Sequence, residues 1–383
     1  MLQDKNVFIW FVLLAVCLSS CVHTSEKNHK NWEKEVKSVD DMLRIFDNEI
    51  KLSAETYIND SINLLNPFNI RIINNYLLVQ DFGNSANGIL SIFDMTNKQF
   101  IGKMLTYGNG PNELLGLRMN SYGNDTLLAL DSYKKTSQLF GVNELRVCNG
   151  IPARIIKYQP PNKGEQIDQS YLFDNKLICS GQFQKGRFQI YDANGKFLHE
   201  FDEFPKVNFG ENQLDNIQRG SIFGADVSFG KNSKMSKLAC LNKSILSIYD
   251  FSEDKNEFVR SFFCQWVFFK VTEARYIGGK PVVRGDQKIN MVGAGKVVTN
   301  DKYLFFNFSD LTISDIINRG NDNRYKYILV TNWDGEPVAK LLLDKAIHFL
   351  LQIDKDGKHL YAIHTDLKTG FAQILRYDIS FLK

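Results

Sequence analysis

Cys21 is the residue whose surroundings most clearly specify a chemical reaction. It ends the motif Leu18-Ser19-Ser20-Cys21, directly after the apolar run Val7–Leu18. A thiol in this position can accept a diacylglyceryl group, and the two small residues before it fit a signal peptidase. Cleavage would make Cys21 the first residue of the mature chain, where its amine can take a further acyl chain.

This motif resembles the lipobox of bacterial lipoproteins. Two alternatives are a transmembrane anchor and a plain secretory signal with an A-x-A cleavage site. The apolar run has about 12 residues, whereas ~20 are needed to cross a bilayer, and its length suits a signal peptide. The serines before Cys21 fit a lipobox better than an A-x-A site. We therefore predict a signal peptide over 1–20 and lipidation of Cys21, with two or more acyl chains giving stable attachment.

The remaining cysteines of the mature chain lack the spacing of a zinc or haem site. No C-x-x-C pair and no nearby histidine occurs around any of them: Cys148, Cys179, Cys240 and Cys264. Cys179 and Cys240 fall at matching places in repeated strands, where a small buried residue fits. We interpret these two as free thiols of the core, although a disulfide among the four cysteines is compatible with a compartment outside the cytoplasm.

Sequence signatures of enzymes are missing. There is no G-x-S-x-G, P-loop, H-E-x-x-H or dinucleotide fingerprint. His359 and His364 have an odd spacing along one predicted strand, so they point to opposite faces and do not share a metal. The net charge of +3 is spread without a basic stripe. We therefore predict no cofactor, no metal and no nucleic-acid partner.

The elements that must position these residues recur about every 50 residues. Each copy has a turn residue and a short apolar strand, and a second strand follows it, often ending on an aromatic residue and Asp, as in Tyr191-Asp192. The copies centre on six leucines: Leu77, Leu127, Leu177, Leu238, Leu304 and Leu360. Turn pairs such as Asn194-Gly195 then lead into a further strand, because these residues tolerate positive φ.

A repeat of this length, with roughly four antiparallel strands, predicts an all-β, six-bladed β-propeller over 48–383. The alternative is one large β-sandwich or two stacked ones, which the regular recurrence disfavours. The last unit has only three strands, and an unpaired edge must be covered. Glu49–Ser53 and Thr56–Ile58 are the candidates, so we predict that an N-terminal strand closes the last blade.

Residues 21–47 are predicted to be a tether that contains a short helix. Their apolar residues step by three and four positions, which is helical spacing: Trp32, Val36, Val39, Leu43, Phe46 and Ile50. The helix either packs on the propeller or binds a partner.

Together these features resemble the six-bladed, TolB-like propeller lipoproteins common in Bacteroidota. The segment Gly108-Asn109-Gly110-Pro111-Asn112-Glu113 looks like the Gly-x-Gly-Pro-x-Glu element of that family. The resemblance implies a lipoprotein of the cell envelope and carries no established reaction. We interpret Gly108, Gly110 and Pro111 as shaping the crossing between two blades, and a binding role for these residues and Glu113 as the alternative.

Function is expected on the face of the propeller that carries the long connections, because binding residues usually lie on loops over a rigid scaffold. One such connection, Gln265–Lys288, contains Trp266, Tyr276 and Arg284, which are residue types of binding anchors. Packing against an edge strand is the other interpretation of these side chains. We predict a monomeric, membrane-attached binding or scaffold protein with an envelope protein or glycan as partner, at the outer membrane rather than the inner. The alternative is a metal-dependent hydrolase or lyase with an axial site.

Overall fold

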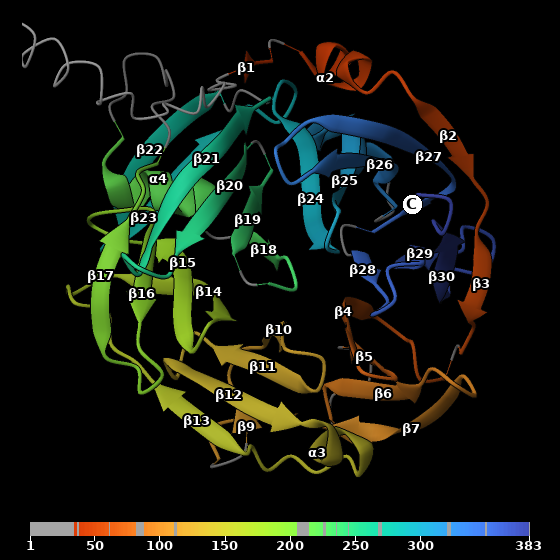
Figure 1. The fold of residues 1–383 in the computed structure, drawn as a ribbon, viewed down its shortest axis with the longest axis horizontal. Helices are drawn as coiled ribbons and strands as arrows, with labels where there is room; N and C mark the ends of the chain where they lie inside the picture. Colours follow the sequence, from red (N-terminus) through yellow and green to blue (C-terminus); the bar gives the residue numbers. More distant parts are fainter. Residues whose placement is uncertain are drawn as a thin grey trace, which may run out of the picture. The chain divides into compact units, whose positions relative to one another are not determined.

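Six antiparallel sheets are arranged as blades around a central axis (Figure 1). Blade 1 contains β4 (Pro67–Ile73), β5 (Tyr76–Asp81), β6 (Leu90–Asp94) and β7 (Gln99–Met104). Blade 2 contains β10 (Arg118–Tyr122), β11 (Thr126–Asp131), β12 (Thr136–Gly141) and β13 (Arg154–Lys157). Blade 3 contains β14 (Gln166–Phe173), β15 (Lys176–Gln182), β16 (Phe188–Tyr191) and β17 (Phe197–Phe201).

The second half of the ring is less regular. Blade 4 contains β18 (Ser228–Lys231), β19 (Lys237–Asn242), β20 (Ile245–Ser252) and β21 (Glu257–Gln265). Blade 5 contains β24 (Met291–Thr299), β25 (Tyr303–Thr312), β26 (Tyr325–Asn332) and β27 (Pro337–Ile347). Blade 6 combines β28 (Leu351–Ile353), β29 (His359–Thr365) and β30 (Ala372–Asp378) with β3 (Glu55–Ile58). The six-bladed propeller predicted from the repeat is therefore confirmed.

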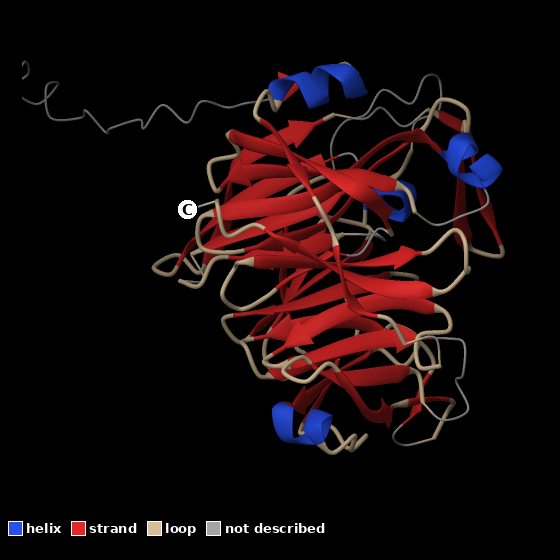
Figure 2. Cartoon of the chain, turned by 90° about the vertical axis from the view of Figure 1, so that its right-hand side faces the viewer, coloured by secondary structure: helices blue, strands red, loops and turns tan. Residues whose placement is uncertain are grey.

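This computed structural model describes residues 34–36, 38–60, 62–81, 88–110, 113–204, 214–224, 227–234, 236–243, 245–266, 270–319, 323–348 and 351–382. The predicted signal peptide and Cys21 lie outside the described residues. Glu33–Lys383 form one compact unit, which includes the C-terminal part of the predicted tether. Seen from the side, strands make up most of this unit and the helices are short (Figure 2).

The hydrophobic core is divided among the contacts between neighbouring blades. Leu78 of blade 1 and Leu127 of blade 2 belong to one buried cluster, and Tyr57 of blade 6 and Val79 of blade 1 belong to another. A strand in the middle of a blade is therefore covered on both faces. This explains why β5 is buried at nearly every position and reads as a continuous apolar run instead of an alternating one.

The strand β3 closes the ring as predicted. It pairs antiparallel with β30, and Thr56 is opposite Leu375. The Glu55 carboxylate accepts a hydrogen bond from the Arg376 Nε at 3.1 Å, and Lys98 Nζ of blade 1 lies 3.3 Å from the same side chain. The Tyr57 hydroxyl donates to the carbonyl of Met95, also in blade 1. One N-terminal strand thus joins the last blade to the first.

The other candidate for this closure has a different position. The strand β2 (Glu49–Leu52) pairs parallel with β27 as a fifth strand of blade 5, so the expectation that Glu49–Ser53 covers blade 6 is wrong. The short β1 (Lys34–Glu35) pairs parallel with β21 of blade 4 in the same way. The N-terminal segment therefore follows the outside of blades 4, 5 and 6 and covers an edge of each (Figure 1).

A short helix, α2 (Val39–Ile45), lies between β1 and β2. The Ser38 hydroxyl caps it by accepting a hydrogen bond from the Asp41 amide at 3.1 Å, which satisfies a backbone donor of the first turn. Met42 is buried, and Phe46 just beyond the helix packs edge-on against Phe306 of blade 5. This apolar face is thus occupied by the propeller.

Candidate functional site

The first strand of each blade lies nearest the axis, and these inner strands surround a channel: β4, β10, β14, β18, β24 and β28 (Figure 1). Each inner strand ends in a short turn to the second strand on one face, which we call the short-turn face. The connections between blades begin on the opposite face, the long-loop face. A cavity occurs at each end of the channel.

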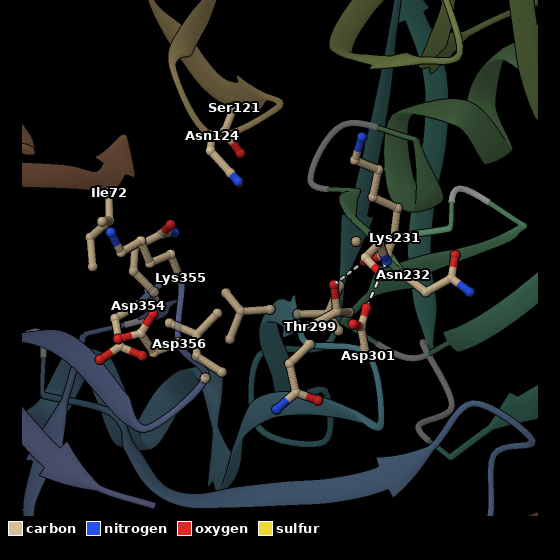
Figure 3. Close-up of a pocket in the computed structure, with 18 of the residues that line it drawn as sticks. Ile72, Ser121, Asn124, Lys231, Asn232, Thr299, Asp301, Asp354, Lys355 and Asp356 are labelled. Atoms are coloured by element: carbon tan, nitrogen blue, oxygen red, sulfur yellow. Dashed lines mark hydrogen bonds between the residues drawn. The ribbon is translucent and has the colours of Figure 1, made fainter. Parts of the chain in front are cut away.

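The short-turn cavity has a volume of about 710 Å³ and is lined by the ends of inner strands and the turns that follow them. Figure 3 shows that polar and charged side chains from separate blades surround it, among them Asn124 of blade 2, Lys231 of blade 4 and Asp354 of blade 6. Residues distant in sequence therefore contribute to one site.

The carboxylates at this mouth hold the turns. Asp301 accepts a hydrogen bond from the Ser233 amide at 2.8 Å, and the hydroxyl and amide of Ser233 lower the pKa of Asp301. Asp354 lies 2.7 Å from Nδ1 of His359 and accepts from the Lys358 amide. Across the described residues, no three or more His, Cys, Asp or Glu side chains form a group that could hold a metal ion.

Arg71 on β4 is the buried cation of the channel. Its side chain lines the short-turn cavity, and the residue is only 6% exposed. The guanidinium donates from Nε to the Met119 carbonyl at 2.9 Å and from a terminal nitrogen to Oδ1 of Asn120 at 2.7 Å. Both acceptors are neutral, and no carboxylate of the described residues pairs with this cation. Burial lowers the pKa of Arg71 to about 10.

The long-loop cavity has a volume of about 540 Å³ and lies between the starts of inner strands and the helix α5 (Ile313–Arg319). Its wall combines apolar side chains such as Met291 and Ile316 with Arg118. Asn69 lines it as well, and its Oδ1 is buried without a hydrogen-bond partner. The cavity therefore offers apolar surface together with a cation and an unused acceptor.

The described ends of the segment 108–113 are held by contacts within the protein. The strands β8 (Thr106–Tyr107) and β9 (Glu113–Leu114) pair in parallel on either side of it. The Glu113 carboxylate accepts from the Gly110 amide at 2.7 Å, and Lys134 Nζ donates to the carbonyls of Gly110 and Glu113. Gly108 has a φ of +154°, and a Cβ there would meet the Glu113 carboxylate. Pro111 lies outside the described residues.

Buried aspartates at matching places in the repeat have a similar role. Asp81 ends the second strand of blade 1 and accepts from the amides of Leu65 and Asn66. Asp131 ends the second strand of blade 2 and accepts from the Leu115 amide at 2.8 Å. These carboxylates hold the incoming connection against each blade, so their burial has a structural explanation.

Trp266, which we expected as a possible binding residue, is buried. Its ring stacks on Phe306 at 5.7 Å, and its indole N–H donates to the carbonyl of Lys243. This aromatic side chain is buried between blades 4 and 5, where a partner at the surface could not contact it. This residue is therefore corrected to a core position.

Tyr276 and Arg284 lie on a separate hairpin, β22 (Val271–Ile277) and β23 (Lys280–Gly285). The Tyr276 hydroxyl donates to Asp215, the N-cap of α4 (Asn216–Phe223), at 2.7 Å, and partial burial with this hydrogen bond raises the pKa of Tyr276 to about 12. Arg284 pairs with Glu273 of the same hairpin at 3.3 Å. The hairpin belongs to the connection between blades 4 and 5, and neither residue lines the short-turn cavity or the long-loop cavity.

The four cysteines of the propeller are free thiols, which agrees with the interpretation of Cys179 and Cys240, and three of the four are buried. Burial raises the pKa of Cys179 and of Cys240, so both remain protonated and unreactive.

Arg71 is the functional candidate that sequence reasoning missed. A signal was present, because the strand Phe68-Asn69-Ile70-Arg71-Ile72 places two polar residues on one side of an otherwise apolar strand. The leucines that define the repeat lie on the second strand of each blade, whereas the first strand lines the channel.

Two solved structures of bacterial proteins are similar to this chain. In a search of solved structures, the chain is similar to a DUF4221 family member from Bacteroides vulgatus, with a TM-score of 0.55, 14% identity, and coverage of 86% of this chain and 98% of that one. It is also similar to a candidate exported protein from Bacteroides fragilis, with a TM-score of 0.49, 13% identity, and coverage of 86% and 98%. No curated protein matches.

The family described as TolB-like 6-blade propeller-like matches residues 46–356, which include the closing strand and most of the ring. The match covers most of the chain and agrees with the six blades seen in the structure. The chain belongs to the TolB-like six-blade propeller family.

Proposed function

We propose that this protein is a non-enzymatic binding propeller of the cell envelope, attached to the membrane through lipid on Cys21, and that it binds a partner protein with its long-loop face. Among the described residues, no helix is long and apolar enough to span a membrane. The motif at Cys21 is the feature that supports attachment.

The observation that carries the binding proposal is the distribution of exposed apolar side chains. Large apolar residues are exposed on the connections of the long-loop face: Ile62, Leu65, Leu115, Tyr133, Ile317, Leu367 and Phe371. Tyr133 is 74% exposed and Leu367 is 69% exposed, although both lie on turns held by hydrogen bonds to a neighbouring aspartate. Apolar groups on rigid turns are typical of protein-binding surfaces.

The short-turn face offers fewer such groups. Its exposed large apolar side chains are Val147, Ile151 and Phe381. The turns that surround the short-turn cavity are polar or charged instead (Figure 3). This difference supports a protein partner on the long-loop face.

Site-specific photo-crosslinking in cells tests the choice of face. A crosslinking residue replaces Tyr133 or Leu367 on the long-loop face, and Val147 or Ile151 as matched exposed positions on the short-turn face. We expect a discrete adduct from the first pair alone, lost when Phe371 is changed to Asp. Adducts of equal yield from both pairs would contradict the proposal, as would their absence from the first pair.

The lipid anchor is tested by Cys21→Ser. The wild-type chain should enter the detergent phase on phase separation, and the variant should remain in the aqueous phase or be retained as the uncleaved precursor, distinguished by its size. A variant that is processed and still enters the detergent phase as strongly as the wild type contradicts lipidation.

A further inference from the structure

We propose that the short-turn cavity binds an oxyanion group, a carboxylate, sulfate or phosphate, on the guanidinium of Arg71. This site is separate from the long-loop face, so the proposal does not depend on the partner suggested above. The ligand class follows from three features of the cavity: a buried cation without a counter-ion, a second proton donor beside it, and a basic rim.

The first feature is the charge of Arg71. A buried cation destabilises the fold unless an anion compensates its charge. Where the chain supplies no anion, a bound ligand can do so. Arg71 is more than nine-tenths buried, and its hydrogen bonds go to a carbonyl and an amide oxygen. The Asn120 amide in turn donates to the Ser170 carbonyl of blade 3, so the guanidinium is held in place. A guanidinium in a fixed orientation suits two-point recognition of an oxyanion.

The second feature is Tyr171 of blade 3, which lines the same cavity. Its ring stacks on Phe229 of blade 4 with a centroid separation of 5.5 Å, so its position is fixed. Tyr171 and Arg71 line the same cavity, and burial raises the pKa of Tyr171 although the charge of Arg71 opposes this increase. The hydroxyl therefore stays protonated and can donate a hydrogen bond to the anion that Arg71 binds.

The third feature is the rim. Four lysines surround the mouth, whereas three aspartates are present: Lys231, Lys302, Lys355 and Lys358 against Asp301, Asp354 and Asp356. Asp301 accepts a hydrogen bond from the Ser233 amide in the turn of blade 4, and Asp354 accepts one within its own turn. With Arg71 included, the lining has five cations against three carboxylates, and this excess of positive charge favours entry of an anion. A cavity of about 710 Å³ has room for an oxyanion carried on a small polar molecule such as a sugar acid.

The test is isothermal titration of the full-length protein in detergent, with sodium sulfate, sodium phosphate, glucuronate and glucose as separate probes at constant ionic strength. We expect at least one oxyanion probe to bind and neutral glucose not to bind. Binding of glucuronate alone identifies a carboxylate on a sugar, and binding of the inorganic anions alone identifies a sulfate or phosphate group.

Two variants connect binding to the site. Arg71→Gln removes the charge and should weaken binding by about tenfold to one-hundredfold, and Tyr171→Phe keeps the stacked ring and should weaken it by about tenfold. Lys185→Gln is the matched control, because it removes one positive charge from an exposed lysine that does not line the cavity, and the affinity should stay within about threefold of wild type in salt.

The proposal is overturned if none of the oxyanions binds the wild type, or if Tyr171→Phe and a folded Arg71→Gln both bind as tightly as the wild type. Should Arg71→Gln fail to fold, the comparison of Tyr171→Phe with Lys185→Gln decides. Long-loop crosslinking in the Arg71→Gln protein separates the two proposals, because the Tyr133 adduct should persist when anion binding is lost.

Discussion

Among the residues whose burial the structure describes, two arginines are almost completely buried, and their surroundings differ. Arg187, next to β16, lies 3.5 Å from the Asp202 carboxylate and donates to the hydroxyl of Ser247. Arg71, on the inner strand β4, has neutral acceptors only. Burial by itself lowers the pKa of both side chains, but around Arg187 the nearby Tyr249 and Asp202 outweigh it and raise the pKa, whereas for Arg71 the decrease remains.

Because of this difference, we interpret Arg187 as a structural cation and Arg71 as a candidate for ligand binding. Asp202 also pairs with Arg260 of β21 at 3.1 Å and accepts from the Tyr249 hydroxyl at 2.6 Å. This network lies away from the channel and joins blades 3 and 4, so the chain itself compensates Arg187. Arg71 faces a cavity at the axis, where a ligand can do the same.

Removal of the counter-ion of Arg187 should have the largest effect. Asp202→Asn leaves that guanidinium buried and uncompensated, so we expect the free energy of unfolding to fall by about 3–5 kcal/mol. Urea denaturation followed by tryptophan fluorescence measures this change. Asp334→Asn is the control, because its partner Lys237 forms an exposed pair, and its cost should be below about 1 kcal/mol. Equal losses in the free energy of unfolding for Asp202→Asn and Asp334→Asn would contradict this interpretation of Arg187.

Removal of the Arg71 charge should change stability much less. Arg71→Met relieves the uncompensated charge but leaves the Met119 carbonyl and the Asn120 amide oxygen without a donor. These effects oppose each other, so the free energy of unfolding without added oxyanion should stay within about 1 kcal/mol of wild type. A loss as large as that of Asp202→Asn, measured by the same denaturation, would show that Arg71 is structural as well.

The exposed pair of Arg376 and Glu55 should give the smallest effect, because solvent screens it. The hydrogen bond from Arg376 lowers the pKa of Glu55 below 4.5. The folded state therefore binds fewer protons than the unfolded state. The pair stabilises the fold above about pH 4.5, and the effect is lost as pH falls through the lower folded value.

Denaturation at about pH 7 and about pH 3 should therefore show a small stability difference between wild type and Glu55→Gln that disappears in acid. A difference that is unchanged by pH would mean that packing of β3, not charge, is what the substitution disturbs.

Closure by β3 could be predicted because three strands in the last unit leave an unpaired edge that some other segment must cover. The parallel pairing of β2 with blade 5 could not, because Glu49–Leu52 and Glu55–Ile58 are both short extended segments. Their assignment depends on where the chain passes around the ring. Trp266 shows the same limit, since an aromatic side chain beside a long connection can face a partner or an adjacent blade.

The amino-acid sequence determined the number of blades and the order of their strands, because burial of strand faces follows a local pattern of apolar residues and turns. The motif at Cys21 predicts the anchor in the same local way. Only the tertiary structure showed that Arg71, Tyr171 and Gln352 line one cavity, because ring closure and blade tilt bring them to the axis. Such convergence depends on contacts between residues far apart in the chain, which no local pattern records.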